Sequence, residues 1–457
     1  MSEKIKSFDD KSQKVLEQIH IPDLMTPEQG KSKGKVAEFG LTLVDIGGTK
    51  ERILVVGVDR EGNILRDVVL AEKEIPTPVR NLPVGDKGYF YDTTADVIGA
   101  VQSDARNIGV KVLPLVCIGT PGRLVNGRIA LGTAGNLGRS FDNISPEEEL
   151  SKRLNQDVHA INDAISQMGY GTNELTKIPE IGEKLRHQRV CYIGPGTGLG
   201  GGFCRVNEDF SLEYFTDGHI FDIKIPRYTG LIPIEFELPG KYQGKKINEH
   251  HRVGIQSRFA EDVLSGRAVR QIACEIDRHL IEHGKEPLFL SLVSGYEHMT
   301  ERERTKALAH NNNKSPVNAK LIDAEILGKK DLDENRERAL PTAEMLARFQ
   351  GEMMGRLIEC IYIGNIEKST EEAQWSAEDI EKVKGTTNFI IGGSAGTKGE
   401  MGRIARETAI GYLRERFPDV EFNLFTIEQT ENAGALGTAS FLKRADIMGV
   451  IERVDVK

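Results

Sequence analysis

The chain has 457 residues, of which 28% are charged and 39% hydrophobic, and its formal net charge is -9. This length predicts two to three domains, and the acidic balance argues against a nucleic acid as the main partner. The five cysteines form no CxxC pair, no signal-peptide pattern opens the chain, and no apolar run approaches the roughly 18–20 residues of a membrane span. We therefore expect a cytoplasmic protein with no membrane partner.

The first 40 residues are polar and rich in lysine. Residues 7–19 could form one short amphipathic helix, and residues 30–35 have the composition of a linker. We expect this segment to be a solvated tail.

The first well-defined motif begins at residue 41. The apolar run at 41–46 predicts a strand buried on both faces, and the β-branched residues at 53–58 predict a second strand. The turn between them contains Gly47 and Gly48, whose backbone freedom lets main-chain N–H groups approach an anion. An ordinary Gly-Gly hairpin turn would have the same sequence pattern.

The next elements alternate between helices and strands, which predicts an α/β fold. A helix is expected at 92–108, a strand at 111–118 and a short hairpin after Arg123. Ser145 and Pro146 predict the start of a helix that extends to residue 154. A short strand at 158–161 then leads into Asn162 and Asp163.

A second glycine turn occurs about 150 residues after the first. Residues 190–206 again follow the pattern of strand, glycine turn with a threonine, and strand. Two copies of one phosphate-turn motif predict two halves of similar design that face one ligand.

The rest of the chain is predicted to be mainly helical from residue 261 to 366. A strand at 388–391, a helix at 399–416, a strand at 420–427 and a small-residue helix at 432–442 follow.

Two further motifs suggest other chemistry. Ser394 lies in a GxSxG pattern, but the last histidine is His310, so a hydrolase triad in its usual chain order is excluded. His279 and His283 match HxxEH, although their charged and glycine-containing flank is typical of an exposed helix end.

An ordered set of motifs resembles the ROK and bacterial-glucokinase branch of the sugar kinases, within the actin–hexokinase–Hsp70 superfamily. The resemblance covers about residues 41–445. It is carried by residues 45–50, 162–164, 196–200 and 391–393, strengthened by 261–266 and 434–435.

The resemblance implies a two-domain, actin-like ATPase (ribonuclease H-like) α/β fold with a central cleft. We expect a small domain formed by 41–170 and 432–457, and a large domain formed by 171–431 with a helical insertion. It also implies ATP-dependent phosphorylation of a hexose at its 6-hydroxyl, with glucose as the first candidate, and we expect a homodimer.

The resemblance further implies roles for individual residues. Asp163 would be the general base, because a carboxylate can take the proton of the attacking hydroxyl. Asp45 would hold Mg²⁺ through water. The sugar-binding residues would be Asn136, Asn162, Asp217, His219 and Glu261. The ATP-binding residues would be Gly47, Gly48, Thr49, Lys50, Gly196, Thr197, Gly198, Gly393 and Ser394.

The chain departs from the family pattern at two places. Thr216 stands where the usual sugar-binding glutamate is found, which puts the contacts to one side of the sugar ring in doubt. The zinc-binding cysteine cluster is missing from 240–246, so no structural zinc is expected.

Two other functions on the same fold stay open. A sugar-sensing transcriptional repressor would carry a helix-turn-helix segment, for which residues 1–40 offer only one recognisable helix. A non-catalytic sugar-binding protein would keep the pocket but transfer no phosphoryl group.

Overall fold

The computed structural model describes residues 25–81, 84–134, 137–196, 198–216, 220, 223, 225, 260–309, 315–366, 375–393, 399–426 and 433–455. The chain forms two compact units. The first contains residues 1–192, 201–218 and 429–457, and the second contains 193–200 and 219–428. The boundary that the sequence places between residues 170 and 171 falls inside a helix that belongs wholly to the first unit.

The first unit is built on a five-stranded sheet with strand order β3-β2-β1-β4-β7. β1 is antiparallel to β2 and parallel to β4, and β4 is parallel to β7. The strands are β1 (Phe39–Ile46), β2 (Lys50–Val58), β3 (Ile64–Pro76), β4 (Lys111–Thr120) and β7 (Asp157–Asn162). β1 is buried along its length, with Asp45 half-buried near its end, which confirms the strand predicted from its apolar run.

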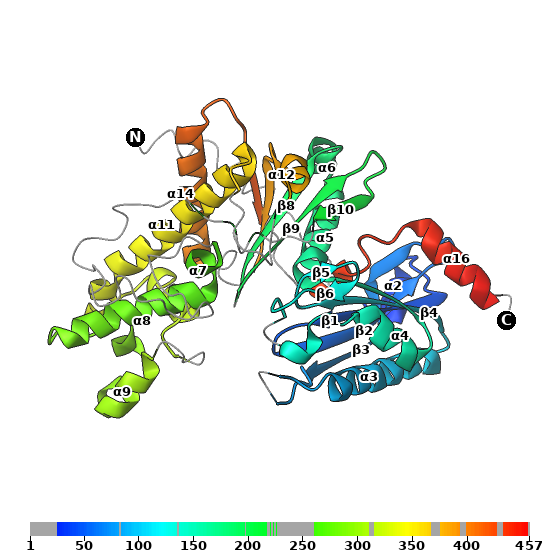
Figure 1. Ribbon diagram of the computed structural model, residues 1–457, viewed down its shortest axis with the longest axis horizontal. Helices are drawn as coiled ribbons and strands as arrows, with labels where there is room; N and C mark the ends of the chain where they lie inside the picture. Colours follow the sequence, from blue (N-terminus) through cyan, green and yellow to red (C-terminus); the bar gives the residue numbers. More distant parts are fainter. Residues whose placement is uncertain are drawn as a thin grey trace. The chain divides into compact units, whose positions relative to one another are not determined.

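Helices cover both faces of this sheet. α3 (Lys87–Asn107) packs on β2, β3 and β4, and α4 (Pro146–Leu154) packs on α3 and β7 (Figure 1). On the face that bears Asp45, α5 (Asp163–Thr176) and α15 (Ala433–Gly437) pack against β4 and β1. The two faces are distinct because successive side chains of a strand alternate, and Val44 belongs to the apolar core beneath α3.

Two helices of the first unit differ in extent from the sequence-based expectation, and a third begins where the sequence places it. α3 begins five residues earlier than predicted, because Asp86 caps its first turn by accepting a hydrogen bond from the Tyr89 N–H. α4 begins after Ser145 as predicted, with the Ser145 side chain as its cap. The helix predicted at 432–442 is limited to α15, and a further helix, α16 (Arg444–Asp455), follows it.

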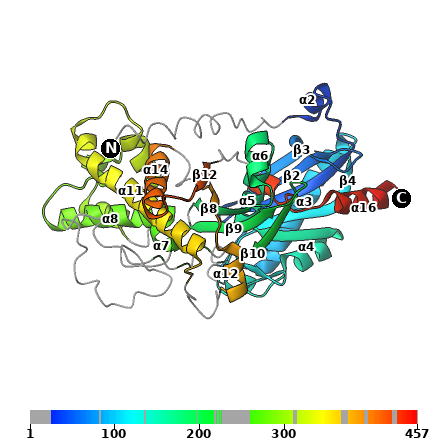
Figure 2. The same cartoon turned by 90° about the horizontal axis from the view of Figure 1, so that it is seen from above.

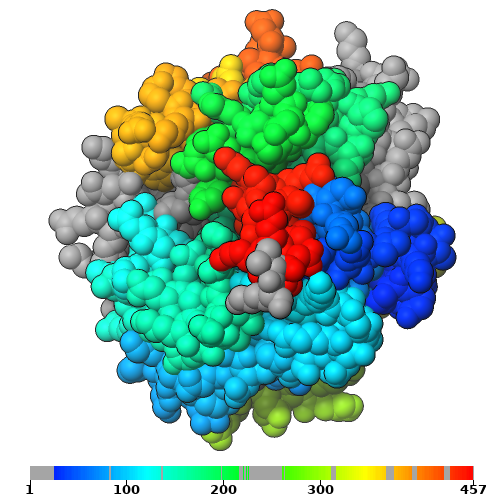
Figure 3. Space-filling model, turned by 90° about the vertical axis from the view of Figure 1, so that its right-hand side faces the viewer, coloured from blue at the N-terminus to red at the C-terminus, as the bar shows by residue number. Residues whose placement is uncertain are grey.

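α16 lies on the outer surface of the first unit. Its residues appear in red beside segments from the first part of the chain in Figure 3. Lys111 pairs with Asp455 at 2.9 Å, and Arg453 pairs with Asp157 at 2.8 Å. These ion pairs join the last described helix to the starts of β4 and β7.

The described residues before β1, 25–38, are held to the sheet at a few points, although most of their side chains are exposed. Met25 is buried, its N–H donates to the Asp67 carbonyl at 2.6 Å, and its carbonyl accepts from the Val69 N–H at 3.0 Å. Helix α2 (Pro27–Ser32) follows with Thr26 as its cap. Most side chains of residues 25–38 are thus exposed, and the segment adds a short helix and main-chain hydrogen bonds from Met25 to β3, which its polar composition does not predict. The helix predicted at 7–19 lies outside the described residues.

Four further short elements belong to the first unit. They are α6 (Pro179–Leu185), the predicted hairpin β5 (Leu124–Val125) and β6 (Arg128–Ile129), and a 3-10 turn at Arg139–Phe141.

A second five-stranded sheet has the order β10-β9-β8-β11-β12. Its strands are β8 (Arg189–Pro195), β9 (Leu199–Val206), β10 (Leu212–Thr216), β11 (Asn388–Ile391) and β12 (Asn423–Thr426). If the strands of each sheet are numbered 1 to 5 along the chain, both sheets have the same spatial order, 3-2-1-4-5. The repeated glycine turn in the sequence thus belongs to a repeated strand arrangement.

Between residues 260 and 366 the second unit is mainly helical where the structure describes it, as predicted. Its helices are α7 (Ala260–Leu264), α8 (Gly266–Glu282), α9 (Glu301–Ala307), α10 (Ala319–Ile322), α11 (Glu334–Ile363), α12 (Ala377–Val383) and α14 (Gly399–Arg416), with a π-helical segment at Asp323–Leu327 and 3-10 turns at Leu290–Leu292 and Tyr296–His298. α11 and α14 lie side by side in Figures 1 and 2. A Cβ on Gly351 of α11 would lie only 2.2 Å from the Ala405 carbonyl oxygen, so glycine permits this close approach.

In the part of the chain that the structure describes, no helix is both long enough and apolar enough to cross a membrane. The five cysteines are all buried and unbridged, as their scattered positions predict.

Candidate active site

Asp163 occupies the first position of α5, directly after β7. Asn162 caps the helix, since its Oδ1 accepts hydrogen bonds from the N–H groups of Ala164 and Ile165. The Asn162 Nδ2 donates to the Gly122 carbonyl at 2.8 Å. This cap holds Asp163 at the positive end of a helix dipole, where a carboxylate is favoured.

Asp45 is the second carboxylate of this site. It lies near the end of β1, where it pairs in register with Gly119 of β4, and Gly119 pairs with Ile161 of β7. β1, β4 and β7 are parallel, so their carboxyl ends lie at one edge of the sheet and bring Asp45 and Asp163 to that edge. The strand order of the first unit therefore places these two predicted site residues close to each other.

Burial raises the pKa of both carboxyl groups, and the Asp45 carboxylate also acts on Asp163. Burial raises the pKa of Asp163 to about 7, the nearby Asp45 carboxylate adds to the rise, and hydrogen bonds from Ala164 and Asn162 oppose it. Burial also raises the pKa of Asp45 to about 6, against the opposing influence of Arg52 and Lys50. A carboxylate that accepts a proton near neutral pH is suited to general-base chemistry.

The turn between β1 and β2 is fixed by hydrogen bonds that the sequence does not reveal. The Gly47 N–H donates to the Lys50 carbonyl at 2.9 Å, and the Thr77 hydroxyl donates to the Gly47 carbonyl at 2.8 Å. Gly48 and Thr49 are exposed, and Lys50 pairs with Glu74 at 2.9 Å. Thr77 lies between two prolines just after β3, and no sequence pattern marks it as a support for the turn.

A separate group of predicted residues comes together in the second unit. The Gly196 N–H donates to the Gly198 carbonyl at 2.8 Å, and the Gly266 N–H at the start of α8 donates to the Gly196 carbonyl at 2.7 Å. Gly393 has a φ of +71°, and a Cβ there would lie 2.2 Å from the Pro195 carbonyl oxygen. Glycine is therefore required where the 391–393 turn meets the end of β8.

Glu261 lies at this second-unit turn. A Cβ on Gly198 would lie 2.8 Å from the Glu261 Oε1, and the same oxygen accepts a hydrogen bond from Arg267 at 2.8 Å. In the described structure Glu261 thus supports the glycine turn, and its contact with a sugar stays a prediction.

Five residues of the predicted site lie outside the described residues: Asn136, Thr197, Asp217, His219 and Ser394. The cysteine-free stretch 240–246 lies outside them as well.

The HxxEH motif lies at the end of α8. The rings of His279 and His283 are 4.1 Å apart, and the helix ends at Glu282, as expected for a helix terminus. Among the described side chains, no group of three or more histidine, cysteine, aspartate or glutamate residues could hold a metal ion.

Solved structures identify the fold. A ROK family glucokinase from Streptomyces griseus, in complex with glucose and AMPPNP, is similar over 88% of this chain and 98% of its own, at 20% identity and a TM-score of 0.51. A ROK hexokinase from Thermus thermophilus is similar over 88% of this chain and 97% of its own, at 15% identity and a TM-score of 0.51. The chain has the fold of the ROK sugar kinases.

The ROK fold also occurs in a protein of a different class. A ROK family transcriptional regulator, a homologue of the E. coli MLC protein, is similar over 98% of this chain and 91% of its own, at 13% identity and a TM-score of 0.52. No family model and no curated protein matches the sequence. Because one ROK fold serves a kinase and a regulator, function has to be argued from the site.

Proposed function

We propose that this chain catalyses the ATP-dependent phosphorylation of a hexose at its 6-hydroxyl, with glucose as the first candidate and Asp163 as the general base. The observation that carries this proposal is the pair formed by Asp163 and Asp45. A protein that only bound sugar would gain nothing from two neighbouring carboxylates that repel each other. A phosphotransferase needs one to take a proton and another to hold the cation that accompanies ATP.

In the proposed reaction, the hexose hydroxyl oxygen attacks the γ-phosphorus of ATP while its proton passes to the Asp163 carboxylate. The bond between the γ-phosphorus and the bridging oxygen breaks, and ADP leaves. The cap formed by Asn162 orients Asp163, and a sugar hydroxyl that bound to the Asn162 Nδ2 would compete with the Gly122 carbonyl and the Asp163 carboxyl group for its hydrogens. At neutral pH a base with a pKa of about 7 is partly ionised and still basic enough to accept the proton.

The residues present fit magnesium. Carboxylate oxygens are the protein ligands that Mg²⁺ prefers, and Mg²⁺ commonly uses only one or two of them together with water and phosphate. A cation beside Asp45 would also offset the repulsion between the two carboxylates. When bound with ATP, it would neutralise charge on the phosphate oxygens.

The proposed phosphate contacts are the exposed turn at 47–50 and the turn that contains Gly196 and Gly198. Small residues at both turns give main-chain N–H groups access to an anion. Gly393 would border the adenosine, as would Ser394, and Thr197 would join the second turn.

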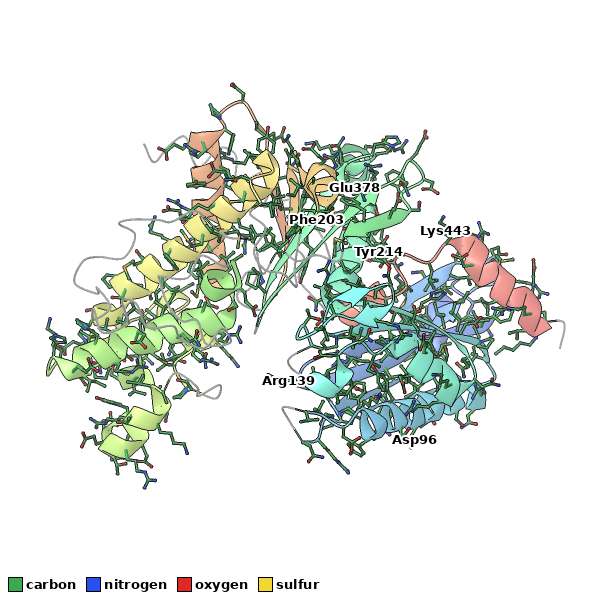
Figure 4. All side chains as sticks on the ribbon, in the orientation of Figure 1. Asp96, Arg139, Phe203, Tyr214, Glu378 and Lys443 are labelled. Carbon is green, nitrogen blue, oxygen red and sulfur yellow. The ribbon has the colours of Figure 1, made fainter. Side chains whose placement is uncertain are left out.

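The test is a coupled assay of sugar phosphorylation across a panel of hexoses and phosphoryl donors. The Asp163→Ala and Asp163→Asn variants should lose about 10²–10⁴-fold in kcat while still binding sugar by calorimetry. The matched control is Asp96→Asn, which neutralises an exposed aspartate of α3 that is labelled in Figure 4. Unchanged turnover in both Asp163 variants would refute the assignment.

The same assay distinguishes the other functions. Sugar binding without phosphoryl transfer from any donor would indicate a non-catalytic sugar-binding protein. Sugar-dependent binding to DNA at low salt would indicate a regulator instead.

A further inference from the structure

Ser166 is a buried residue one turn after Asp163 on α5. Its hydroxyl is fully shielded from solvent and donates a hydrogen bond to the main-chain carbonyl of Gly434, at the start of α15. The two residues are 268 positions apart in the chain. The bond therefore ties the helix that carries the proposed base to the last part of the chain.

Gly434 and its neighbours pack tightly around Ser166 and Asp45. A Cβ on Gly434 would lie 2.2 Å from the Asp45 Oδ2, so the Asp45 carboxylate rests against this glycine. A Cβ on Gly437 would lie 1.9 Å from the Ser166 carbonyl oxygen. Ser166 also faces Gly119, the register partner of Asp45, since a Cβ on Gly119 would lie 3.5 Å from the Ser166 Cβ.

We propose that Ser166 is a positioning residue for the site: by holding Gly434 against Asp45, its hydroxyl fixes the separation of the Asp45 and Asp163 carboxylates. The inference rests on the proposed function for its catalytic meaning. The geometric part, a hydroxyl that controls the spacing of two carboxylates, stands independently of turnover.

Removal of the Ser166 hydroxyl should change the pKa of Asp163, because charged groups face both Asp163 and Asp45. Asp163 is influenced by Asp45, and Asp45 is influenced by Arg52 and Lys50. Without the Ser166 hydroxyl, the buried Gly434 carbonyl loses its partner, α15 is held less closely, and the Asp45 carboxylate can move away and admit water. The repulsion felt by Asp163 then weakens, and its pKa falls.

The experiment compares Ser166→Ala with Thr172→Val in the full chain. Thr172 lies on the same helix, is equally buried, and donates to the Met168 carbonyl at 2.9 Å, so its variant also removes one buried hydroxyl from α5. Carbon-13 NMR of selectively labelled aspartate carboxyl groups follows the titration of Asp163, with Asp45 and Asp163 signals assigned from Asp45→Asn and Asp163→Asn.

We expect Ser166→Ala to lower the titration midpoint of Asp163 by about one pH unit, a typical effect of one neighbouring charge, and Asp45→Asn to lower it at least as much. Thr172→Val should leave it unchanged. An unchanged midpoint in Ser166→Ala, or an equal change in Thr172→Val, would overturn the inference.

The NMR titration needs neither substrate nor turnover, so the two proposals can fail separately. If the wild-type chain transfers no phosphoryl group but Ser166→Ala still shifts the midpoint, the proposed function fails and the positioning role stands. If the chain is an active kinase, Ser166→Ala should also move the acid limb of its kcat/KM profile to lower pH, and Thr172→Val should not.

Discussion

The Asp45 carboxylate lies against the α-carbon of Gly434, with its Oδ2 only 2.2 Å from where a Cβ would be. No side chain larger than hydrogen fits at position 434 unless Asp45 moves. The end of β1 and the start of α15 are almost 400 residues apart in the chain, and they are in close contact where the Asp45 carboxylate meets Gly434.

We predict that Gly434→Ala displaces the Asp45 carboxylate and lowers kcat at least tenfold, with a smaller effect on the KM for sugar. The matched control is Gly449→Ala in α16, where a Cβ would meet no atom within 4 Å. That control should keep full activity and gain up to about 1 kcal/mol of stability, because alanine favours a helix more than glycine does. Steady-state kinetics and thermal melts check both variants. Equal activity in the two would show that the close contact has no consequence for the site.

The pH dependence of activity should follow Asp163. Its carboxyl group must be ionised to accept a proton, so kcat/KM should fall as the pH drops below about 7, where the pKa of Asp163 lies. Asp45→Asn removes a negative neighbour, so it should shift this acid limb to lower pH even though it reduces the rate. Profiles between about pH 5 and 9 at constant ionic strength measure the effect. An acid limb that does not move in Asp45→Asn would argue against coupling between the two carboxylates.

The pH dependence of stability should have a defined sign. The pKa of Asp163 is raised from 3.8 to about 7 in the folded state, so the folded state binds more protons than the unfolded state between these values. The contribution of Asp163 to the free energy of unfolding therefore falls as the pH rises through this window. We predict that Asp163→Asn is more stable than the wild type above about pH 7, and that this gain disappears below about pH 4. Thermal melts at the two pH values test it, and a gain that persists in acid would contradict the assignment.

The cap of α5 should affect both the stability of the chain and the pKa of Asp163. Asn162→Ala removes the acceptor for two main-chain N–H groups and should cost about 0.5–2 kcal/mol. Asn162→Asp keeps a capping oxygen but loses the hydrogen bond to the Gly122 carbonyl. It also adds a negative charge beside Asp163, so it should raise the pKa of Asp163 and shift the acid limb of kcat/KM to higher pH. Denaturant unfolding and pH–rate profiles of the two variants would distinguish these effects.

The turn at Gly393 should be intolerant of any side chain. Gly393→Ala combines a strained φ of +71° with a contact of 2.2 Å to the Pro195 carbonyl oxygen. Gly284→Ala is the control, because Gly284 has a φ of +69° but a Cβ there would meet no atom within 4 Å. The control should cost about 1–2 kcal/mol, the strain of a left-handed residue alone. Gly393→Ala should cost more and raise the KM for ATP. Similar losses in both variants would mean that the contact with Pro195 relaxes.

Much of the fold follows from local sequence patterns. The apolar run before Asp45 predicts β1, because a strand that is buried on both faces has apolar residues at successive positions. Ser145 and Pro146 predict the start of α4, because capping and a preset φ act within a single turn. The glycine turns at 47–48 and 196–200 predict two similar halves, and both sheets have the same strand order.

Other features depend on partners that are distant in sequence. Residues 25–38 have the composition of a tail, and most are exposed, but main-chain hydrogen bonds tie Met25 to β3. Nothing near Thr77 or Ser166 in the sequence indicates that one hydroxyl supports the 47–50 turn and the other binds Gly434. α16 is likewise held by ion pairs to strands that precede it by about 300 residues or more.

The amino-acid sequence by itself determined the α/β class and the two glycine turns, because turn chemistry and strand patterning are properties of short segments, and the resemblance of its ordered motifs to the ROK kinases singled out Asp163 and Asp45. Only the tertiary structure decided that the Asp45 carboxylate raises the pKa of Asp163, that Gly434 lies against Asp45 and that Ser166 binds Gly434. The physical reason is that the sheet register and the packing of α15 on α5 set those distances, and both depend on contacts between segments that are remote along the chain.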